Sequence, residues 1–555
     1  MNFREDKTIV ALSSAPGISG IAVLRMSGAQ AGPIAASVFR EPRAKCPFYT
    51  GPSHTIHYGW IVDPAGERVD EVLLMWMKGP GTYTGEDTVE INCHGGPYVS
   101  RRVMETLVQA GAELAEPGEY SRRAYLNGKM DLTKAEAVMD LISSETELSR
   151  RASVSQLRGS LFEKTEKLRA RLLDLLTETE VNIDYPEYDV PEVSSERLLR
   201  VCGEVADEAR QLYHTAEAGR VLRSGIRTAI VGAPNVGKSS LLNLLSGTDR
   251  AIVTDIPGTT RDTLEETVDL DGVPLRITDT AGIRETSDTV ERLGVERACR
   301  VLGESDLVLL VVDASRPVTE EDDELLRAVA GTGELLRAVA GTGELLRTVA
   351  GTGELLRTVA GTGELLWTVA GPGEQFRTVM GAGKISADGG KPAPAASCGK
   401  TFLVLLNKSD AATFGPDELA ARWEKIVPGI RGENRSSDGA VAGDSRPGRG
   451  SRIIRFSAKT GEGRDELSAR IKELFLGGIV LNDHTPLITN LRQKQALAKA
   501  IEALERVAEG GRAGFELDLL AIDLHEAYDA LGEISGHSVD TDLTDAVFSR
   551  FCLGK

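Results

Sequence analysis

The chain has 555 residues, with 83 Asp and Glu against 64 Lys and Arg, which gives a formal net charge of −19 at pH 7. A surface this acidic argues against a protein that coats nucleic acid, so any contact with a phosphate backbone requires a local basic patch. The length exceeds what one hydrophobic core can organise and indicates two to four domains.

The six cysteines are far apart and form no CxxC pair, which favours reduced thiols over a disulfide scaffold or a zinc site. They are Cys46, Cys93, Cys202, Cys299, Cys398 and Cys552. The opening MNFREDKTIVALSS does not resemble a signal peptide, and no window approaches the roughly 20 apolar residues of a membrane span. We therefore expect a soluble cytoplasmic protein that does not enter a membrane.

The predicted elements divide the chain into four segments. Residues 1–122 mix short β-type runs with Gly and Pro, which predicts an α+β domain, and residues 123–220 change to amphipathic helices. One helical face is expected to carry Leu168, Leu172, Leu175 and Leu176. From 221 to 475 strands and helices alternate, which indicates an α/β domain with a mainly parallel sheet, and 476–555 is helical again. The fold class is therefore multidomain α+β and α/β, with the α/β module inserted between two helical segments that could pack together.

Six tandem copies of a decapeptide occupy residues 324–383, from ELLRAVAGTG to EQFRTVMGAG. On a helix, successive copies would face directions about 80° apart, and two glycines per copy weaken the helix ends, so the copies cannot share a straight apolar seam. We predict an exposed expansion within a connection, with a stacked solenoid that binds a ligand as the alternative. A second biased segment, 431–451, has the Gly, Ser and Pro content of a flexible loop.

The sequence GAPNVGKS at 232–239 matches the phosphate-loop pattern G-x-x-x-x-G-K-[ST] and lies between a buried-type strand and an expected helix. Its glycines let backbone N–H groups surround the phosphates, Lys238 would reach the outer phosphates as a catalytic residue, and Ser239 would ligate Mg²⁺. The predicted contacts are Asn235, Val236, Gly237, Lys238, Ser239 and Ser240.

Two strand-end motifs are expected to bind the base. The first is NKSD, with Asn407, Lys408, Ser409 and Asp410. The Asp410 carboxylate could accept hydrogen bonds from the N1 and exocyclic amino groups of guanine, whereas adenine offers an acceptor there, so GTP is favoured over ATP. The second, SAK, is expected at the guanine carbonyl and comprises Ser457, Ala458 and Lys459.

Two further stretches are expected around the terminal phosphate. In TDIPGTTRD, Thr260 is the expected mobile-loop ligand of Mg²⁺, and in RITDTAGIRE, Asp279 is the expected outer-sphere Mg²⁺ carboxylate. The predicted contacts are Thr254, Asp255, Ile256, Pro257, Gly258, Thr259, Thr260, Asp279, Thr280, Ala281 and Gly282. Ile283 stands where Ras-type enzymes place the Gln that orients the attacking water, so another polar group must do this. Glu285, Asp288 and Glu291 are candidates, and each could equally be a solvated charge on a helix.

Several stretches together resemble the MnmE (TrmE) family of tRNA modification GTPases. They are TIVALSSAPGISGIAVLRMSG, YTGEDTVEINCHGGP, PGEYSRRAYLNGKMDLTKAEAVMDLI, the phosphate-loop module and the terminal FCLGK. The resemblance implies an N-terminal domain that binds 5-formyltetrahydrofolate or a related tetrahydrofolate and forms a homodimer, a discontinuous helical domain and an inserted Ras-like GTPase domain. It also implies that the enzyme adds an aminomethyl or carboxymethylaminomethyl group to C5 of the wobble uridine of certain tRNAs. It would do so in a heterotetramer with an FAD-dependent partner of the MnmG type.

The resemblance also assigns residues. The folate contacts it implies are Arg25, Glu90, Lys129 and Lys555. Hydrolysis is expected to be activated by pairing of GTPase domains and by K⁺, whose implied ligands are Asn235, Thr254, Thr259 and the backbone carbonyl of Ile256. Glu291 aligns with the family's water-orienting glutamate. Pro257 departs from the family pattern and would stiffen the mobile loop.

Two questions remain open at the level of sequence. A GTPase switch in ribosome assembly, without modification chemistry of its own, shares the same nucleotide motifs, but the sequence contains neither a KH-type G-x-x-G loop nor a basic tail. At the terminus, a lone thiol such as Cys552 is ordinarily inert. The resemblance implies instead that Phe551 anchors the tail, that Lys555 lies near the pterin, and that Cys552 faces the modification site as a nucleophile or general acid.

Overall fold

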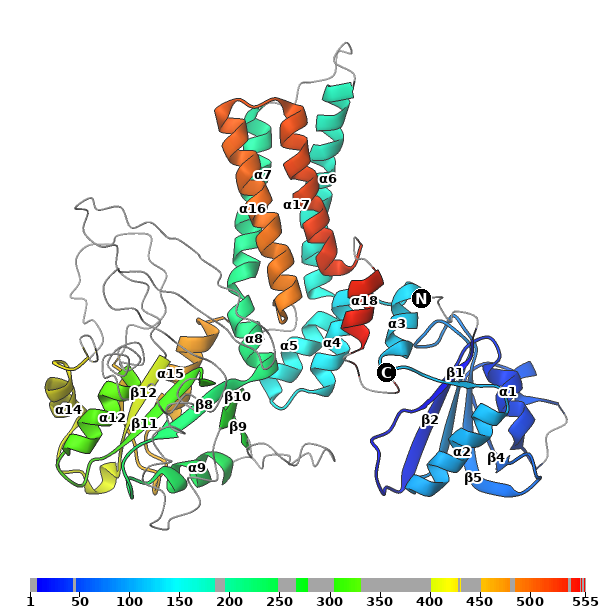
Figure 1. The fold of residues 1–555 in the computed structure, drawn as a ribbon, viewed down its shortest axis with the longest axis horizontal. Coiled ribbons are helices and arrows are strands. Elements are labelled where there is room, and N and C mark those ends of the chain that lie inside the picture. The colour runs from blue at the N-terminus through cyan, green and yellow to red at the C-terminus, as the bar shows by residue number, and fades with distance from the viewer. Residues whose placement is uncertain are drawn as a thin grey trace, which may run out of the picture. The chain divides into compact units, whose positions relative to one another are not determined.

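The computed structural model forms two compact units (Figure 1). The first unit comprises residues 1–223 and 479–555, and the second comprises 224–478. The structure describes residues 7–42, 46–184, 195–247, 266–277, 304–330, 401–427, 430, 451–479, 485–537, 541–549, 551 and 554.

The amino-terminal part of the first unit is built on a sheet that contains, among the described residues, seven strands in the order β3-β4-β5-β6-β2-β1-β7. Successive side chains of a strand point to opposite faces. In β5, Val72, Leu74 and Trp76 are therefore buried on one face, where they pack in a core with α1 and α2. The elements are β1 (Ile9–Leu12), β2 (Ile21–Ser27), α1 (Ala31–Val38), β3 (Phe39–Arg40), β4 (Thr55–Val62), β5 (Arg68–Met77), β6 (Thr88–His94), α2 (Pro97–Gln109) and β7 (Glu113–Leu114).

The helices on both sides of the second unit in sequence share one hydrophobic core. Leu172 of α6, Val205 of α7 and Leu497 of α16 belong to the same buried cluster. The predicted apolar face of α6 is confirmed, because all four of its expected leucines are buried in this cluster. The helices are α3 (Glu119–Leu126), α4 (Leu132–Ile142), α5 (Glu147–Leu157), α6 (Ser160–Asp184), α7 (Ser195–His214), α8 (Ala216–Ser224), α16 (Leu491–Ala513), α17 (Leu517–Ser535) and α18 (Thr541–Phe548).

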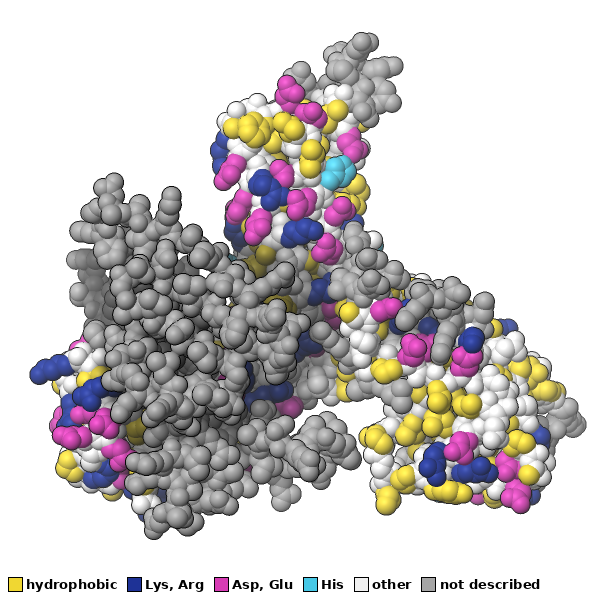
Figure 2. Space-filling model, in the orientation of Figure 1, with side chains coloured by type: hydrophobic (Ala, Val, Ile, Leu, Met, Phe, Trp, Pro, Cys, Tyr) yellow, Lys and Arg dark blue, Asp and Glu magenta, His cyan; other side chains and the backbone are white. Residues whose placement is uncertain are grey.

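Ion pairs cover the outside of these long helices. Arg171 of α6 pairs with Glu204 and Glu208 of α7, and Arg506 of α16 pairs with Asp523 of α17. Figure 2 accordingly shows acidic and basic side chains interspersed on the visible face of the helices. Exposed pairs of this kind each contribute at most about 1 kcal/mol, so the buried leucines contribute more to holding the helices together.

The second unit contains, in the part that the structure describes, a six-stranded sheet in the order β13-β12-β11-β8-β10-β9. β10, β8, β11, β12 and β13 are parallel to one another, and β9 pairs with β10 in the antiparallel direction. Parallel strands bring their carboxyl ends to one edge, where ligands of open α/β sheets bind. The elements are β8 (Ile226–Val231), α9 (Lys238–Gly247), β9 (Glu266–Leu270), β10 (Val273–Ile277), β11 (Leu307–Asp313), α12 (Glu320–Ala330), β12 (Thr401–Asn407), α14 (Pro416–Trp423), β13 (Ile453–Arg455) and α15 (Arg464–Leu476).

The first repeat copy corrects one expectation. We predicted that residues 324–383 form an exposed expansion, yet Glu324 to Ala330 complete helix α12. Leu326 and Val329 are buried and pack with strand residues such as Leu310 in the core of the second unit. The expectation of exposure is therefore wrong for the first copy, because the sheet offers its apolar side chains a surface to cover. The remaining copies lie outside the described residues.

Two further findings concern membrane-spanning helices and free cysteines in the part of the chain that the structure describes. None of these helices combines the length and apolar composition needed to cross a bilayer. Of the cysteines in the described ranges, Cys46, Cys93 and Cys202 are free thiols. Burial raises the pKa of Cys93 to about 11 and that of Cys202 to about 12, so neither is a thiolate at neutral pH.

Candidate functional site

The phosphate loop follows β8 and leads into α9, as the sequence predicts. Two of its glycines are required by close contacts. A Cβ on Gly232 would lie 2.4 Å from the backbone oxygen of Val311, and a Cβ on Gly237 would lie 2.3 Å from Asn407 Nδ2. The loop backbone therefore lies against the ends of β11 and β12, with its next residues at the amino end of a helix, a favourable place for an anion.

Lys238 lies over this loop. Its ammonium donates hydrogen bonds of 2.8 Å to the backbone oxygens of Gly232 and Ala233, and burial lowers its pKa. These acceptors are neutral, so the positive charge of Lys238 is available to a phosphate. Ser239 and Ser240 are exposed at the start of α9, and Asn235 is exposed with a left-handed φ of 62°.

Asn407 joins the three described nucleotide motifs. Its Nδ2 donates a 2.7 Å hydrogen bond to the backbone oxygen of Val236 in the phosphate loop. Its Oδ1 accepts a 2.9 Å hydrogen bond from the backbone N–H of Ala458. The asparagine therefore sets the spacing between the phosphate loop and the loops that follow β12 and β13.

The residues expected at guanine are held by neighbouring side chains. Asp410 Oδ1 accepts a 2.9 Å hydrogen bond from the Ser457 hydroxyl, which fixes the orientation of the carboxylate. Lys408 Nζ lies 2.7 Å from Asp313 Oδ2 at the end of β11. Burial acts to raise the pKa of Asp313, but the hydrogen bonds from Lys408 and Ser315 lower it overall, so Asp313 is ionised.

Sequence reasoning missed two supporting carboxylates in this site. Asp313 binds Lys408, and Glu462 accepts a 2.6 Å hydrogen bond from the hydroxyl of Ser409. Asp313 had a signal, because it ends the buried-type run LVLLVVD on the strand paired with β12. Glu462 lies in a polar loop and gave no such signal.

Part of the predicted nucleotide site lies outside the described residues. This holds for Thr254, Asp255, Ile256, Pro257, Gly258, Thr259, Thr260, Asp279, Thr280, Ala281, Gly282 and Glu291. The structure brings together the phosphate loop, NKSD and SAK. The Mg²⁺ contact of Thr260, most of the K⁺ contacts and the role of Glu291 stay predictions.

Arg25 and Glu90, two of the predicted folate contacts, face each other on the side of the seven-stranded sheet opposite the core with α1 and α2, and both side chains are largely buried. They are cross-strand partners on β2 and β6, and Arg25 Nε lies 2.8 Å from Glu90 Oε1. The guanidinium also lies near the rings of Tyr83 and Tyr120, with centroids 5.6 and 5.8 Å away. The two tyrosines were not predicted from sequence, and they restrict Arg25 to one orientation.

The carboxyl-terminal tail returns to this place. The backbone oxygen of Gly554 accepts hydrogen bonds from Ser13 Oγ at 3.2 Å and Arg25 Nη1 at 3.5 Å. Phe551 is buried against Phe548 and Leu132. The tail is thus held by an aromatic residue before it reaches Arg25.

Of the other predicted folate and tail residues, Lys129 is described by the structure, and the hydrogen bond that it donates is not to Arg25 or Glu90. Lys129 Nζ donates a 2.8 Å hydrogen bond to the backbone oxygen of Pro80, in the loop that carries Tyr83. Lys555 and Cys552 lie outside the described residues.

An apolar strip lies on the same side of the sheet. Tyr58 of β4 is directly opposite Leu73 of β5, and Ile56 is opposite Met75. Ile56 is 65% exposed, Tyr58 51% and Leu73 47%. Contiguous exposed apolar side chains of this kind mark surfaces that contact another protein, a ligand or a membrane.

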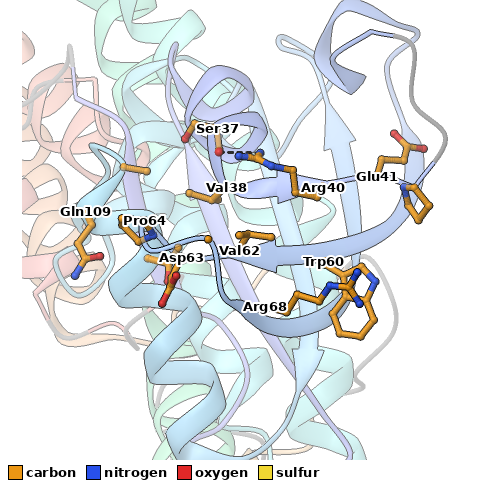
Figure 3. Close-up of a pocket in the computed structure, with 14 residues that line it drawn as sticks. Ser37, Val38, Arg40, Glu41, Trp60, Val62, Asp63, Pro64, Arg68 and Gln109 are labelled. Carbon is orange, nitrogen blue, oxygen red and sulfur yellow. Dashed lines mark hydrogen bonds between the residues drawn. The ribbon is translucent and has the colours of Figure 1, made fainter.

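A cavity of about 700 Å³ lies at the edge of this sheet formed by β3 and β4, and residues of α1 and α2 also line it (Figure 3). Arg40 in its wall donates a 2.9 Å hydrogen bond to the backbone oxygen of Ser37, and Arg68 stacks on Trp60 at 4.6 Å. None of the residues predicted to bind nucleotide or folate lines the cavity. The cavity is therefore separate from the residues described at the two sites above.

The phosphate loop after β8, NKSD after β12 and SAK after β13 lie at the carboxyl edge of one parallel sheet. This arrangement defines the second unit as a P-loop GTPase module inserted, in sequence, into the first unit.

Comparison with known proteins gives the family. Residues 8–129 match the model of the GTP-binding protein TrmE N-terminus, and residues 132–552 match that of the MnmE helical domain. The chain is 40% identical over 552 residues to tRNA modification GTPase MnmE of Lactobacillus delbrueckii subsp. bulgaricus, covering 99% of both chains. It is 40% identical over 557 residues to the protein of that name from Enterococcus faecalis, again covering 99% of both. The chain belongs to the MnmE family of tRNA modification GTPases.

Proposed function

We propose that this protein hydrolyses GTP and uses that reaction in the modification of tRNA. With an FAD-dependent partner of the MnmG type, it would add an aminomethyl or carboxymethylaminomethyl group to C5 of the wobble uridine of certain tRNAs. The observation that carries the proposal is the Asn407 bridge, which joins the phosphate loop to the guanine motifs in a chain that matches its relatives over their full length.

Different residues of the second unit would contact the phosphates, the base and the Mg²⁺ ion of Mg²⁺–GTP. Lys238 and the loop amides would hold the phosphates, Asp410 would select guanine, and Ser239, exposed at the helix start, fits a ligand of Mg²⁺. When bound, Mg²⁺ and K⁺ would neutralise charge on the phosphates. Asn235 is the described residue that fits K⁺, with Thr254, Ile256 and Thr259 as further proposed ligands, and Glu291 would orient the water.

The pair of Arg25 and Glu90 supports a folate site in the first unit. A pterin presents N–H donors and a carbonyl acceptor along one edge, and the adjacent carboxylate and guanidinium offer the complementary groups. Lys129 and Lys555 would complete the site for a tetrahydrofolate that supplies the one-carbon unit. Cys552, near the same tail, is proposed as a nucleophile or general acid, and a Cys552→Ser protein that modifies tRNA normally would remove that role.

The apolar strip supports a homodimer formed by the amino-terminal parts of two copies. A second copy seated on Ile56, Tyr58 and Leu73 would also border Arg25 and Glu90, which share that face of the sheet. A Tyr58→Glu, Leu73→Glu protein is expected to be monomeric in analytical ultracentrifugation. We further propose that the protein acts in the cytoplasm, where its tRNA substrate is found.

Nucleoside analysis of tRNA tests the modification directly. A strain that lacks this protein should lose the modified wobble uridine, and the wild-type gene should restore it. Unchanged tRNA in the deletion strain would contradict the proposal.

Steady-state hydrolysis assays test the two proposed activators of the chemical step. GTP hydrolysis should be much faster in KCl than in NaCl, and a Glu291→Ala protein should bind GTP normally but lose hydrolysis. Equal rates in both salts would contradict the proposed K⁺ site. Normal turnover by Glu291→Ala would show that Glu291 does not orient the water.

A further inference from the structure

Both covalent connections to the second unit meet one buried carboxylate in the first unit. The first connection is α8, and the second returns through residues 485–490 into α16. Asp140 of α4, 4% exposed, contacts both of them. Its Oδ1 lies 2.8 Å from Arg223 Nε near the end of α8, and its Oδ2 accepts a 3.0 Å hydrogen bond from the hydroxyl of Thr489.

Close packing leaves these two connections little freedom to move independently. A Cβ on Gly219 of α8 would lie 2.0 Å from the backbone oxygen of Ile488, and the N–H of Ile488 donates a 3.1 Å hydrogen bond to Thr215 Oγ1. Gln156 of α5, fully buried, donates a 2.7 Å hydrogen bond to the backbone oxygen of Leu487. A displacement of either connection must therefore disturb the other or break contacts with Asp140.

The same helix, α4, holds the carboxyl-terminal tail at its other end. Leu132 and Ala135 of α4 pack against Phe548 and Phe551. One turn after Leu132, Glu136 forms two 2.9 Å hydrogen bonds with Arg492 at the start of α16.

Arg492 extends this set of contacts towards the tail by a second route. Its Nη2 donates a 3.1 Å hydrogen bond to the backbone oxygen of Ile534 near the end of α17, the helix that precedes α18 and the tail. Two sets of contacts thus lead from the connections to the tail, one through α4 and one through α17.

We propose that Asp140 is a positioning residue that couples the nucleotide state of the second unit to the placement of the carboxyl-terminal tail, through Arg223 and Thr489. The inference rests on the proposed function, in which the tail borders the folate site. A buried carboxylate that loses its partner is strongly disfavoured, so a movement of one connection should be passed to the other rather than break its contact with Asp140. The cluster contains no nucleotide-binding residue, so it need not affect hydrolysis itself.

Hydrogen–deuterium exchange of the full-length protein tests the coupling without tRNA. The peptides to follow cover 132–142 and 541–549, with GDP and with a non-hydrolysable GTP analogue bound. In the wild type their exchange should differ between the two nucleotides, and Arg223→Gln, Asp140→Asn and Thr489→Val should remove the difference. Arg223→Lys, which keeps the charge, should restore part of it. Asp207→Asn, which removes a surface carboxylate paired with Arg210, is the control and should behave as wild type.

The variants should hydrolyse GTP at the wild-type rate, while GTP-dependent tRNA modification in the complex with the partner falls roughly tenfold. If Asp140→Asn does not fold, Thr489→Val, a substitution of similar shape, carries the test. The inference is overturned if wild-type exchange is independent of nucleotide, if the variants keep the difference, or if their hydrolysis falls in parallel with modification. A nucleotide-dependent exchange that the variants lose supports the inference even if wild type modifies no tRNA, a result that would contradict only the proposed function.

Discussion

The two candidate sites are assembled over different distances in the sequence. In the nucleotide site, motifs that each follow a parallel strand meet at one sheet edge, and a single side chain, Asn407, links them. At Arg25, the partners Glu90 and Gly554 are 65 and 529 positions away. The first arrangement follows from sheet topology, whereas the second also requires the chain to return after the whole GTPase module.

The two sites also differ in net charge. Lys238 donates to neutral backbone oxygens, so its charge remains available for phosphates. The charge of Arg25 is matched by Glu90, which suits a ring with both donors and acceptors better than a polyanion. The site formed by strand-end motifs thus presents a net positive charge at Lys238, whereas the site assembled from distant segments presents an ion pair with no net charge.

The largest effect is expected where one side chain selects the base. Asp410→Asn replaces one acceptor by a donor, so GTP affinity should fall by about 10²- to 10⁴-fold because hydrogen bonds to a charged group are lost. Xanthosine triphosphate, whose acceptor matches the new amide, should bind better than GTP. Titration with fluorescent nucleotides measures both, with Glu418→Gln on α14 as the control. If Asp410→Asn still prefers GTP to xanthosine triphosphate as the wild type does, Asp410 does not contact the base.

A matched pair of leucines tests whether local sequence decides which residues enter the core. The first two repeat copies are identical, so Leu326 and Leu336 have the same decapeptide around them. Leu326→Ala should destabilise the second unit by about 2–5 kcal/mol, because a buried leucine is lost. Leu336→Ala, in a copy that the sequence predicts to be exposed, should change stability by less than about 0.5 kcal/mol. Urea unfolding followed by circular dichroism compares them. Equal losses would mean that the second copy is also part of the core.

The Arg25 site should lose its ligand without loss of the nucleotide site. Arg25→Ala leaves Glu90 without its 2.8 Å partner and removes a contact of the tail, so affinity for 5-formyltetrahydrofolate should fall about 10- to 100-fold by calorimetry. GTP hydrolysis by the same protein should be unchanged. Arg101→Ala on α2 is the control for removal of an arginine. If folate binding persists in Arg25→Ala, the ligand lies elsewhere in the first unit.

The smallest effect concerns the buried carboxylate in the first unit. Burial raises the pKa of Asp140 to about 6, with Arg223 and Thr489 opposing the shift and Glu136, itself paired with Arg492, adding to it. A raised pKa contributes stability that is present below about pH 4 and is lost as the pH rises through about 6. Relative to Asp140→Asn, which does not titrate, the wild type should therefore lose on the order of 1–2 kcal/mol between pH 4 and 7. Urea unfolding at several pH values measures the difference, and a difference that does not depend on pH would show that Asp140 titrates normally.

The sequence predicted that the phosphate loop, NKSD and SAK lie together, because each motif is short and contiguous. Each ends a strand, and strand direction places all of them at one edge, so Lys238, Asn407, Asp410 and Ala458 are recognisable from local patterns alone. The pairing of Arg25 with Glu90 follows no such rule. The family resemblance points to both residues, but their contact depends on the register between β2 and β6.

The sequence alone determined the family, the insertion of one module between two helical segments, and the positions of the phosphate-loop, NKSD and SAK motifs at strand ends, because these depend on local patterns. Only the tertiary structure decided that Tyr83 and Tyr120 hold Arg25, that Glu462 supports Ser409, and that Asp140 receives both connections. It also decided that Leu326 and Val329 of the first repeat copy belong to the core of the second unit. That placement depends on packing against strands distant in the sequence, which the local pattern of the decapeptide does not encode.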